Sequence, residues 1–152
     1  MLTYLPKIQH LAEGVNPEMR NISPMPKNSA PSVLVVDDEA LIRWTLAETL
    51  GERGYAVTEA GDARMALSAI EHADEPFDVV LLDYRLPDSA DLRLLEKVRR
   101  LVPKARVIMI TAHNSPELAQ GAAALGAYRV ISKPFEVESL ADLVNQARRD
   151  AV

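Results

Sequence analysis

The stretch VVLLDYRLPD (residues 79–88) runs from four consecutive apolar residues into an aspartate and a proline-containing turn. Three further apolar runs are short, rich in β-branched residues and followed by polar groups: residues 33–36, 107–110 and 128–131. Apolar residues at successive positions are typical of strands buried on both faces, as in a parallel sheet. A weaker run at residues 56–60 includes Thr58 and Glu59 and predicts a strand at the sheet edge.

Between these runs, apolar residues recur at the spacing of amphipathic helices. Five such stretches follow the five predicted strands, at residues 42–50, 63–70, 94–101, 118–125 and 137–147. Alternation of strand and helix predicts an α/β fold with right-handed crossovers and helices on both faces of an open, doubly wound parallel sheet. In such sheets the ligand site lies beyond the carboxyl ends of the strands.

The composition narrows the function classes. The chain has 152 residues, no cysteine, and 17 basic against 22 acidic side chains, for a net charge of -5. Without cysteine there is no disulfide, thiolate nucleophile or cysteine-bound metal. The acidic balance argues against direct nucleic-acid binding, which needs clustered Lys and Arg. No apolar run approaches the roughly 20 residues of a membrane span, and no signal peptide is recognisable, so we expect a cytoplasmic protein that does not bind membranes.

The first 31 residues differ from the rest. They contain five of the ten prolines, and their basic residues outnumber their acidic ones by one, although the chain as a whole is acidic. We interpret residues 1–31 as a flexible N-terminal extension and residues 32–150 as one folded domain. Within the extension, residues 6–14 predict a short helix with Ile8 and Leu11 on one face.

The polar residues that follow the strands are the candidate site. Asp37 and Asp38 follow the first strand, Asp83 the third, Thr111 the fourth and Lys133 the fifth. Three crowded carboxylates repel one another unless a cation neutralises them, and oxygen ligands with room for water favour Mg²⁺. A lysine and a hydroxyl beside them can hold phosphoryl oxygens. Asp83, alone at the end of the central strand, is the natural nucleophile for an acyl phosphate.

Each of these residues also has an ordinary structural interpretation. The pair Asp37 and Asp38 is compatible with a helix cap, and Asp83 with turn formation before a proline. Thr111 is an ordinary residue at a strand end, and Lys133 an ordinary surface charge. Because all of them are predicted to meet at one edge of the sheet, the combination favours a functional site.

Four motifs, in order, carry a resemblance to a known family: VLVVDDE (33–39), VVLLDYRLPD (79–88), VIMITA (107–112) and VISKPF (130–135). The chain from residue 32 to 149 resembles the receiver domain of two-component response regulators. The stretch LLDYRLPDSADLRLL (81–95), together with ALIRW (40–44), is similar to receivers of enhancer-binding transcription activators.

The resemblance implies a flavodoxin-like (βα)5 fold with strand order 2-1-3-4-5, the order already known for flavodoxin and the chemotaxis receiver. It implies that Asp83 accepts a phosphoryl group from the phosphohistidine of a sensor histidine kinase or a phosphotransfer protein. Asp38, Asp83 and the backbone carbonyl of Arg85 would bind Mg²⁺, and Asp37 would act through metal-bound water. Such a domain catalyses only its own phosphorylation and dephosphorylation and turns over no external metabolite.

The resemblance also assigns the phosphoryl contacts and the output surface. Lys133 and Thr111 would contact the phosphoryl oxygens, together with the backbone amides of Tyr84 and Ala112. The peptide bond between Lys133 and Pro134 is expected to be cis. Phosphorylation would change the surface built from the fourth helix, fifth strand and fifth helix, which would bind a downstream output domain or protein.

Two positions depart from the family pattern. The family has Tyr or Phe three residues before the lysine, where this chain has Val130. Tyr128 is expected on the same strand face, about 6 to 7 Å back along the strand, too far to replace that aromatic. We therefore predict that phosphorylation moves Thr111 and its loop without a rotamer change at position 130. Asp91 stands where many receivers have glycine and predicts a different turn.

Trp44 and the histidines complete the candidates. On a helical wheel Trp44 falls opposite the apolar face formed by Ile42 and its neighbours. Three interpretations stay open: shallow packing on its own helix, an anchor for the N-terminal extension, or contact with a second subunit in a homodimer. The three histidines share no ligand spacing and are interpreted as surface or loop residues: His10, His72 and His113.

Two other function classes compete with a phosphorylated receiver. A binding module with this fold that works without phosphorylation would not need the full set of acids, threonine and lysine. A metal-dependent phosphohydrolase with an aspartate nucleophile would need a cap or substrate pocket, and no segment of the sequence is a candidate for one.

Overall fold

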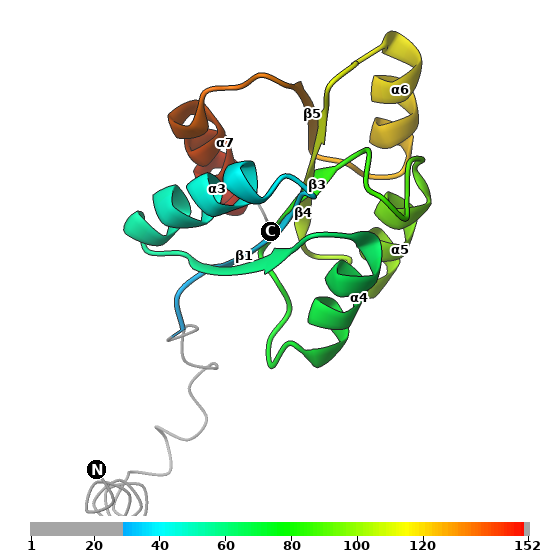
Figure 1. Ribbon diagram of the computed structural model, residues 1–152. Coiled ribbons are helices and arrows are strands. Elements are labelled where there is room, and N and C mark those ends of the chain that lie inside the picture. The colour runs from blue at the N-terminus through cyan, green and yellow to red at the C-terminus, as the bar shows by residue number, and fades with distance from the viewer. Residues whose placement is uncertain (1–28, 151–152) are drawn as a thin grey trace, which may run out of the picture.

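The computed structural model describes residues 29–150, so the helix predicted at residues 6–14 lies outside the described residues. Strands and helices alternate along the chain (Figure 1). The elements in order are β1 (Ser32–Val36), α3 (Ala40–Glu52), β2 (Ala56–Ala60), α4 (Ala63–His72), β3 (Val79–Asp83), α5 (Arg93–Leu101), β4 (Arg106–Thr111), α6 (Pro116–Ala124), β5 (Arg129–Ser132) and α7 (Val137–Asp150). Each strand and helix predicted within residues 32–150 is therefore present, with bounds that differ by a few residues.

The five strands form one parallel sheet in the order β2-β1-β3-β4-β5, which confirms the predicted flavodoxin-like order. Helices α3 and α7 cover one face of the sheet, and α4, α5 and α6 cover the other (Figure 1). Every crossover carries the chain over a face of the sheet, so all five strands point their carboxyl ends toward the same edge. That edge is where the candidate residues lie.

The core consists of two apolar layers, one on each face of the sheet. One layer joins the central strands to α3 and α7 through residues such as Leu46 and Val144. The other joins them to α4, α5 and α6 through residues such as Leu95 and Ala122. All five residues of β3 are buried, as its unbroken apolar run predicts.

The expectation that residues 128–131 form a strand buried on both faces is wrong. The strand β5 begins at Arg129, lies at the edge of the sheet beside β4, and has no fully buried residue. Its position follows from the strand order, because the last strand in the order 2-1-3-4-5 has a neighbour on one side only. Its apolar residues Val130 and Ile131 still pack against the layers on the two faces.

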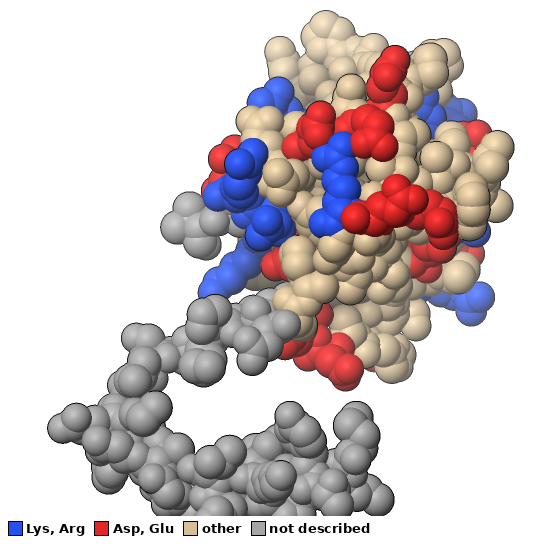
Figure 2. Space-filling model, turned by 90° about the vertical axis from the view of Figure 1, so that its left-hand side faces the viewer, with Lys and Arg blue, Asp and Glu red and all other residues tan. Residues whose placement is uncertain are grey.

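Helices α3 and α7 are joined by charged as well as apolar contacts. Arg53, which follows α3, forms ion pairs with Glu138 and Asp142 of α7, the latter at 2.6 Å. Tyr55 donates a hydrogen bond of 3.3 Å to Asn145 of the same helix. On the side that carries α3 and α7, acidic and basic side chains lie interleaved (Figure 2).

Within residues 29–150, no helix is both long and apolar enough to cross a membrane.

The contacts of the domain begin slightly before the predicted boundary at residue 32. The hydroxyl of Ser29 donates a 2.9 Å hydrogen bond to Glu75, and the carbonyl of Pro31 accepts one of 2.9 Å from the Ala56 amide. Residues 29–31 therefore lead directly into β1 beside the edge strand β2.

Candidate functional site

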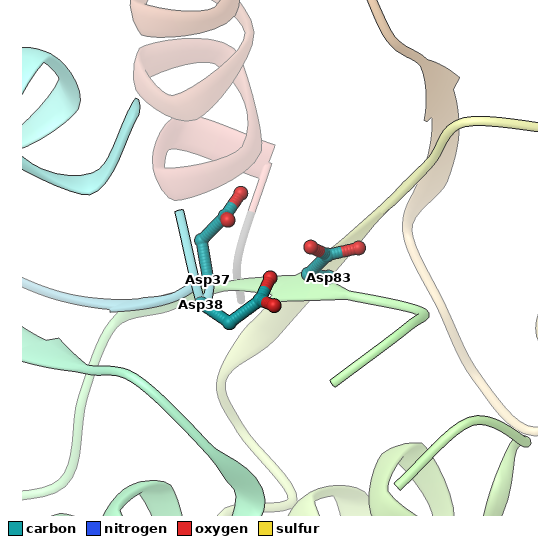
Figure 3. A group of neighbouring side chains, drawn as sticks. All are labelled: Asp37, Asp38 and Asp83. Atoms are coloured by element: carbon teal, nitrogen blue, oxygen red, sulfur yellow. The ribbon is translucent and has the colours of Figure 1, made fainter. Parts of the chain in front are cut away.

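Three aspartates meet at the carboxyl edge of the sheet. Asp37 and Asp38 follow β1 and Asp83 ends β3, and one carboxylate oxygen of each lies within 4.8 Å of the others. Figure 3 shows the three carboxylates around one space. Asp37 and Asp83 are only 1% and 5% exposed, while Asp38 is exposed. The strands β1 and β3 are direct neighbours, so the sheet itself brings these acids together.

Lys133 supplies the one ammonium group within reach of these acids among the described residues. Its Nζ lies 3.1 Å from Oδ2 of Asp83 and 3.1 Å from Oδ2 of Asp37. A third acid, Glu39, contacts the same Nζ at 2.9 Å. The backbone holds the lysine in place, because its amide donates a 2.8 Å bond to the Thr111 carbonyl, and the Lys133–Pro134 peptide bond is cis, as expected.

Burial and charge shift two pKa values in this cluster. Burial raises the pKa of Asp83, the Arg85 amide counteracts this, and the neighbouring Asp37 charge raises it further. The ammonium of Lys133 works in the opposite direction on the pKa of Asp83. Burial lowers the pKa of Lys133, but its contacts with the carboxylates of Glu39 and the two buried aspartates outweigh burial and raise it. The lysine is therefore charged throughout the physiological range.

The donor set fits a hard divalent cation. Three carboxylates and one ammonium leave the cluster with excess negative charge, and all the candidate ligand atoms are oxygens. Oδ2 of Asp37 is buried and, although it forms the ion pair with Lys133, accepts no hydrogen bond of good geometry. Charge and unused acceptor capacity both point toward a cation beside Asp37, Asp38 and Asp83.

A cavity of about 250 Å³ opens directly over Asp83. Thr111, which is buried at the end of β4, lines it together with Ala112 and His113. The hydroxyl oxygen of Thr111 accepts a 3.2 Å bond from the His113 amide, which leaves the hydroxyl hydrogen available for a ligand. The cavity thus has a carboxylate at its base, an ammonium on one side and a hydroxyl on the other.

The Tyr84 amide, which is predicted to contact a phosphoryl group, has a backbone partner here. That amide donates a 2.8 Å hydrogen bond to the carbonyl of Ile110, the residue that pairs with Asp83 at the end of the β3–β4 ladder. The Arg85 amide instead faces the acceptor and donates a 3.2 Å bond to Oδ1 of Asp83. In this state Tyr84 and Arg85 both line the cavity, but the backbone donor that contacts the acceptor carboxylate belongs to Arg85.

Sequence reasoning missed two residues at the site. Glu39 pairs with Lys133, and its own amide donates a 2.8 Å bond to Oδ1 of Asp37. Its position directly after the acidic pair was a signal that could have identified it. His113 is a loop residue, as predicted, but it also lines the cavity. His72 lies on the surface and contacts Ser68 of its own helix, while His10 lies outside the described residues.

The structure shows how the positions that depart from the family pattern pack. Val130 packs against the layer on the α4, α5 and α6 side, whereas Tyr128 packs against the layer on the α3 and α7 side. The expectation that they share a face is wrong, because β5 begins after Tyr128 and the strand alternation does not extend to it.

Asp91 accepts a 2.9 Å bond from the Arg93 amide at the start of α5. Trp44 is 57% exposed, as the helical wheel predicts.

A doubly wound parallel sheet with an acidic cluster, a lysine and a threonine at its carboxyl edge defines a class of signalling α/β domains that bind a divalent cation and a phosphoryl group. Comparison with known proteins identifies the family within that class. Residues 33–145 match the response regulator receiver domain family, and the chain belongs to it. It is therefore a receiver domain of two-component systems.

Relatives include a response regulator much longer than this chain and a phosphotransferase of about the length of the matched domain. The response regulator PilR of Pseudomonas aeruginosa is 37% identical over 121 residues, which cover 80% of this chain and 27% of that protein. Sporulation initiation phosphotransferase F of Bacillus subtilis is 31% identical over 114 residues, 75% of this chain and 90% of that protein. The chain thus spans about a quarter of the length of PilR.

Solved structures show the same fold. A CheY-like receiver domain from Methanospirillum hungatei JF-1 superposes with a TM-score of 0.75 at 32% identity, covering 80% of this chain and 96% of that one. The receiver domain of NtrX from Brucella abortus gives a TM-score of 0.70 at 36% identity, covering 78% and 99%.

Proposed function

We propose that Asp83 accepts a phosphoryl group from the phosphohistidine of a sensor histidine kinase or a phosphotransfer protein. The observation that carries this proposal is the contact of Lys133 Nζ with Oδ2 of the buried Asp83, at 3.1 Å, beside two further aspartates. A carboxylate oxygen of Asp83 forms the new P–O bond, and the P–N bond of the donor breaks. Its electron pair stays on the imidazole nitrogen of the donor.

The residues around Asp83 have distinct roles in this transfer. Lys133 holds one phosphoryl oxygen by charge, while the Thr111 hydroxyl and the Ala112 amide donate hydrogen bonds to others. Asp38, Asp83 and the Arg85 carbonyl would hold Mg²⁺, with Asp37 acting through water, and the ion would neutralise part of the phosphoryl charge. The chain turns over no external substrate and acts only on its own acyl phosphate.

The output surface is proposed to be the one formed by α6, β5 and α7, the fourth helix, fifth strand and fifth helix of the domain. Thr111 ends β4 directly beside β5, since Thr111 pairs with Ser132. A shift of Thr111 toward a bound phosphoryl group therefore acts on β5 first. The partner on this surface would be a downstream output domain or protein, in the cytoplasm.

The test uses the chain with Mg²⁺ and acetyl phosphate, beside an Asp83→Asn variant, and measures intact mass. We expect a gain of one phosphoryl group in the wild-type protein and none in Asp83→Asn, because the amide is a poor nucleophile. An Asp91→Asn variant, which changes an aspartate outside the cluster, should still be phosphorylated. A wild-type protein that gains no phosphoryl group with Mg²⁺ would favour a binding module that works without phosphorylation.

A further inference from the structure

The outer surface of α3 carries two exposed apolar side chains. Leu41 is 75% exposed and Trp44 is 57% exposed, and together they are half of the four exposed large apolar side chains among residues 29–150. Residues three apart on a helix lie on the same side of it, so the two form one patch. The fold does not need them, because α3 packs on the sheet through Leu46 and Leu50.

An apolar groove of about 520 Å³ lies beside this patch, between α3 and the segment that joins β5 to α7. Leu41 and Ile42 contribute from α3, and Phe135 and Val137 from the opposite side. Trp44 stands one turn along the helix from Leu41. The groove and the patch together offer a continuous apolar surface of the kind that receives another polypeptide segment.

The end of the groove is acidic. Glu39 and Lys133 line it, but the charge of Lys133 is shared among three acids: Glu39, Asp37 and Asp83. A segment that fits this groove is therefore apolar and carries positive rather than negative charge.

This chain contains such a segment. Residues 1–12, MLTYLPKIQHLA, hold four large aliphatic side chains at intervals of three, namely Leu2, Leu5, Ile8 and Leu11. Lys7 is the one charged side chain among these twelve residues, since the first acid, Glu13, comes after them. Both the apolar content and the sign of the charge match the groove.

The connection is long enough for the segment to reach the groove. Residues 13–28 separate it from Ser29, and about 16 residues span up to roughly 53 to 58 Å when extended. The strand β1, which leads from that point to the edge where Glu39 lies, has five residues and a length of about 17 Å. A tether of this kind gives an effective concentration in the millimolar range, so that even a weak contact is populated.

We propose that residues 1–12 of this chain bind in the groove beside α3 and cover Leu41 and Trp44. Because Glu39 and Lys133 line both this groove and the cavity over Asp83, the bound segment lies beside the phosphorylation site.

The test follows the fluorescence of Trp44, the single tryptophan of the chain, in the full-length protein. Acrylamide quenching is compared between wild type and a variant with Ile8→Asp and Leu11→Asp. Loss of each apolar contact lowers the ratio of bound to unbound segment about tenfold or more. We expect the variant to show a larger quenching constant and a red-shifted emission, while Met25→Asp, in the same extension but outside the segment, leaves both unchanged.

Two results would overturn the proposal. If the wild-type protein and the double variant are quenched equally, residues 1–12 do not cover Trp44. If quenching of Trp44 falls as protein concentration rises, and the mass in solution doubles, a second copy occupies the surface instead. Since neither measurement involves phosphorylation, a failure here is distinct from a failure of Asp83 to accept a phosphoryl group.

Discussion

At the scale of single residues, the difference at position 130 bears most on how this receiver responds. Val130 has no aromatic ring that could rotate toward Thr111, and Tyr128 is held elsewhere. The Tyr128 hydroxyl donates a 2.6 Å hydrogen bond to Asp150, and the guanidinium groups of Arg106 and Arg129 lie 5.4 and 5.7 Å from the centre of its ring. These contacts tie Tyr128 to the end of α7 and away from the phosphorylation site.

We therefore predict that phosphorylation moves Thr111 and the loop after β4, while Tyr128 keeps its contact with Asp150. The reason is that no ring is available to fill space vacated by Thr111, so the backbone must adjust. Structures with and without a beryllofluoride adduct on Asp83 would measure both movements. A rotation of Tyr128 into the cavity over Asp83 would contradict the prediction.

The residues of the site show what the sequence could and could not predict. Asp37, Asp83 and Lys133 were predictable because a parallel sheet gathers whatever follows its strands at one edge. The hydrogen bond from the Tyr84 amide to the Ile110 carbonyl was not, because it depends on the register in which β3 pairs with β4. That register is set by the packing of whole strands, and no residue type encodes it.

At the scale of elements, the loop after the phosphorylation site is tied to α4. Asp88 accepts hydrogen bonds from the amides of Ala63 and Arg64, at 2.8 and 3.1 Å. Asp62 accepts a 2.7 Å bond from the next amide, that of Met65. Two acids therefore cap the first turn of α4. One is Asp62, the residue directly before the helix, and the other is Asp88, from the loop that follows β3.

The tie to α4 should depend on pH. Hydrogen bonds from Ala63 and Arg64 outweigh burial and lower the pKa of Asp88, so its folded pKa lies below its unfolded pKa of about 3.9. Its stabilising effect is then fully present above pH 3.9 and is lost as pH falls through the folded pKa. We predict that Asp88→Ala lowers the free energy of unfolding by about 1 kcal/mol at neutral pH and by much less in acid.

Urea unfolding of wild type and Asp88→Ala over a range of pH would measure this difference. Asp91→Ala is the matched control, because Asp91 accepts from the amide of Arg93 in its own turn and does not reach α4. A difference between wild type and Asp88→Ala that stays constant from neutral to acid pH would show that the carboxylate charge is not what holds the loop.

The element β5 shows where hydrophobic pattern alone misleads. Its apolar run resembles those of β1 and β3, yet β5 lies at the edge of the sheet. An apolar run predicts that helices cover both faces of a strand, and the apolar residues of β5 do pack against the layers on both faces. The run does not reveal whether the strand has one neighbouring strand or two. Strand order follows from the crossovers of the whole chain, so the degree of burial at β5 could not be predicted from its own residues.

At the scale of the whole molecule, the buried aspartates at the carboxyl edge of the sheet destabilise the folded domain. Asp37 and Asp83 are buried at the ends of the two central strands and share the single ammonium of Lys133. Two buried carboxylates with one cation repel each other: burial raises the pKa of Asp83, and the charge of Asp37 raises it further. Since β1 and β3 are the centre of both apolar layers, relief of this repulsion stabilises the whole domain and not just a loop.

Binding of Mg²⁺ should therefore raise the global stability of the protein. A ligand that binds only the folded state adds RT ln(1 + [L]/Kd), about 1.4 kcal/mol at ten times the dissociation constant. Thermal unfolding with Mg²⁺ or with EDTA, at equal ionic strength, would measure the shift. We expect the shift in wild type and in Asp91→Asn, and its loss in Asp38→Asn, which removes a carboxylate of the cluster but no ion pair with Lys133. An equal shift in all three proteins would place the ion outside the aspartate cluster.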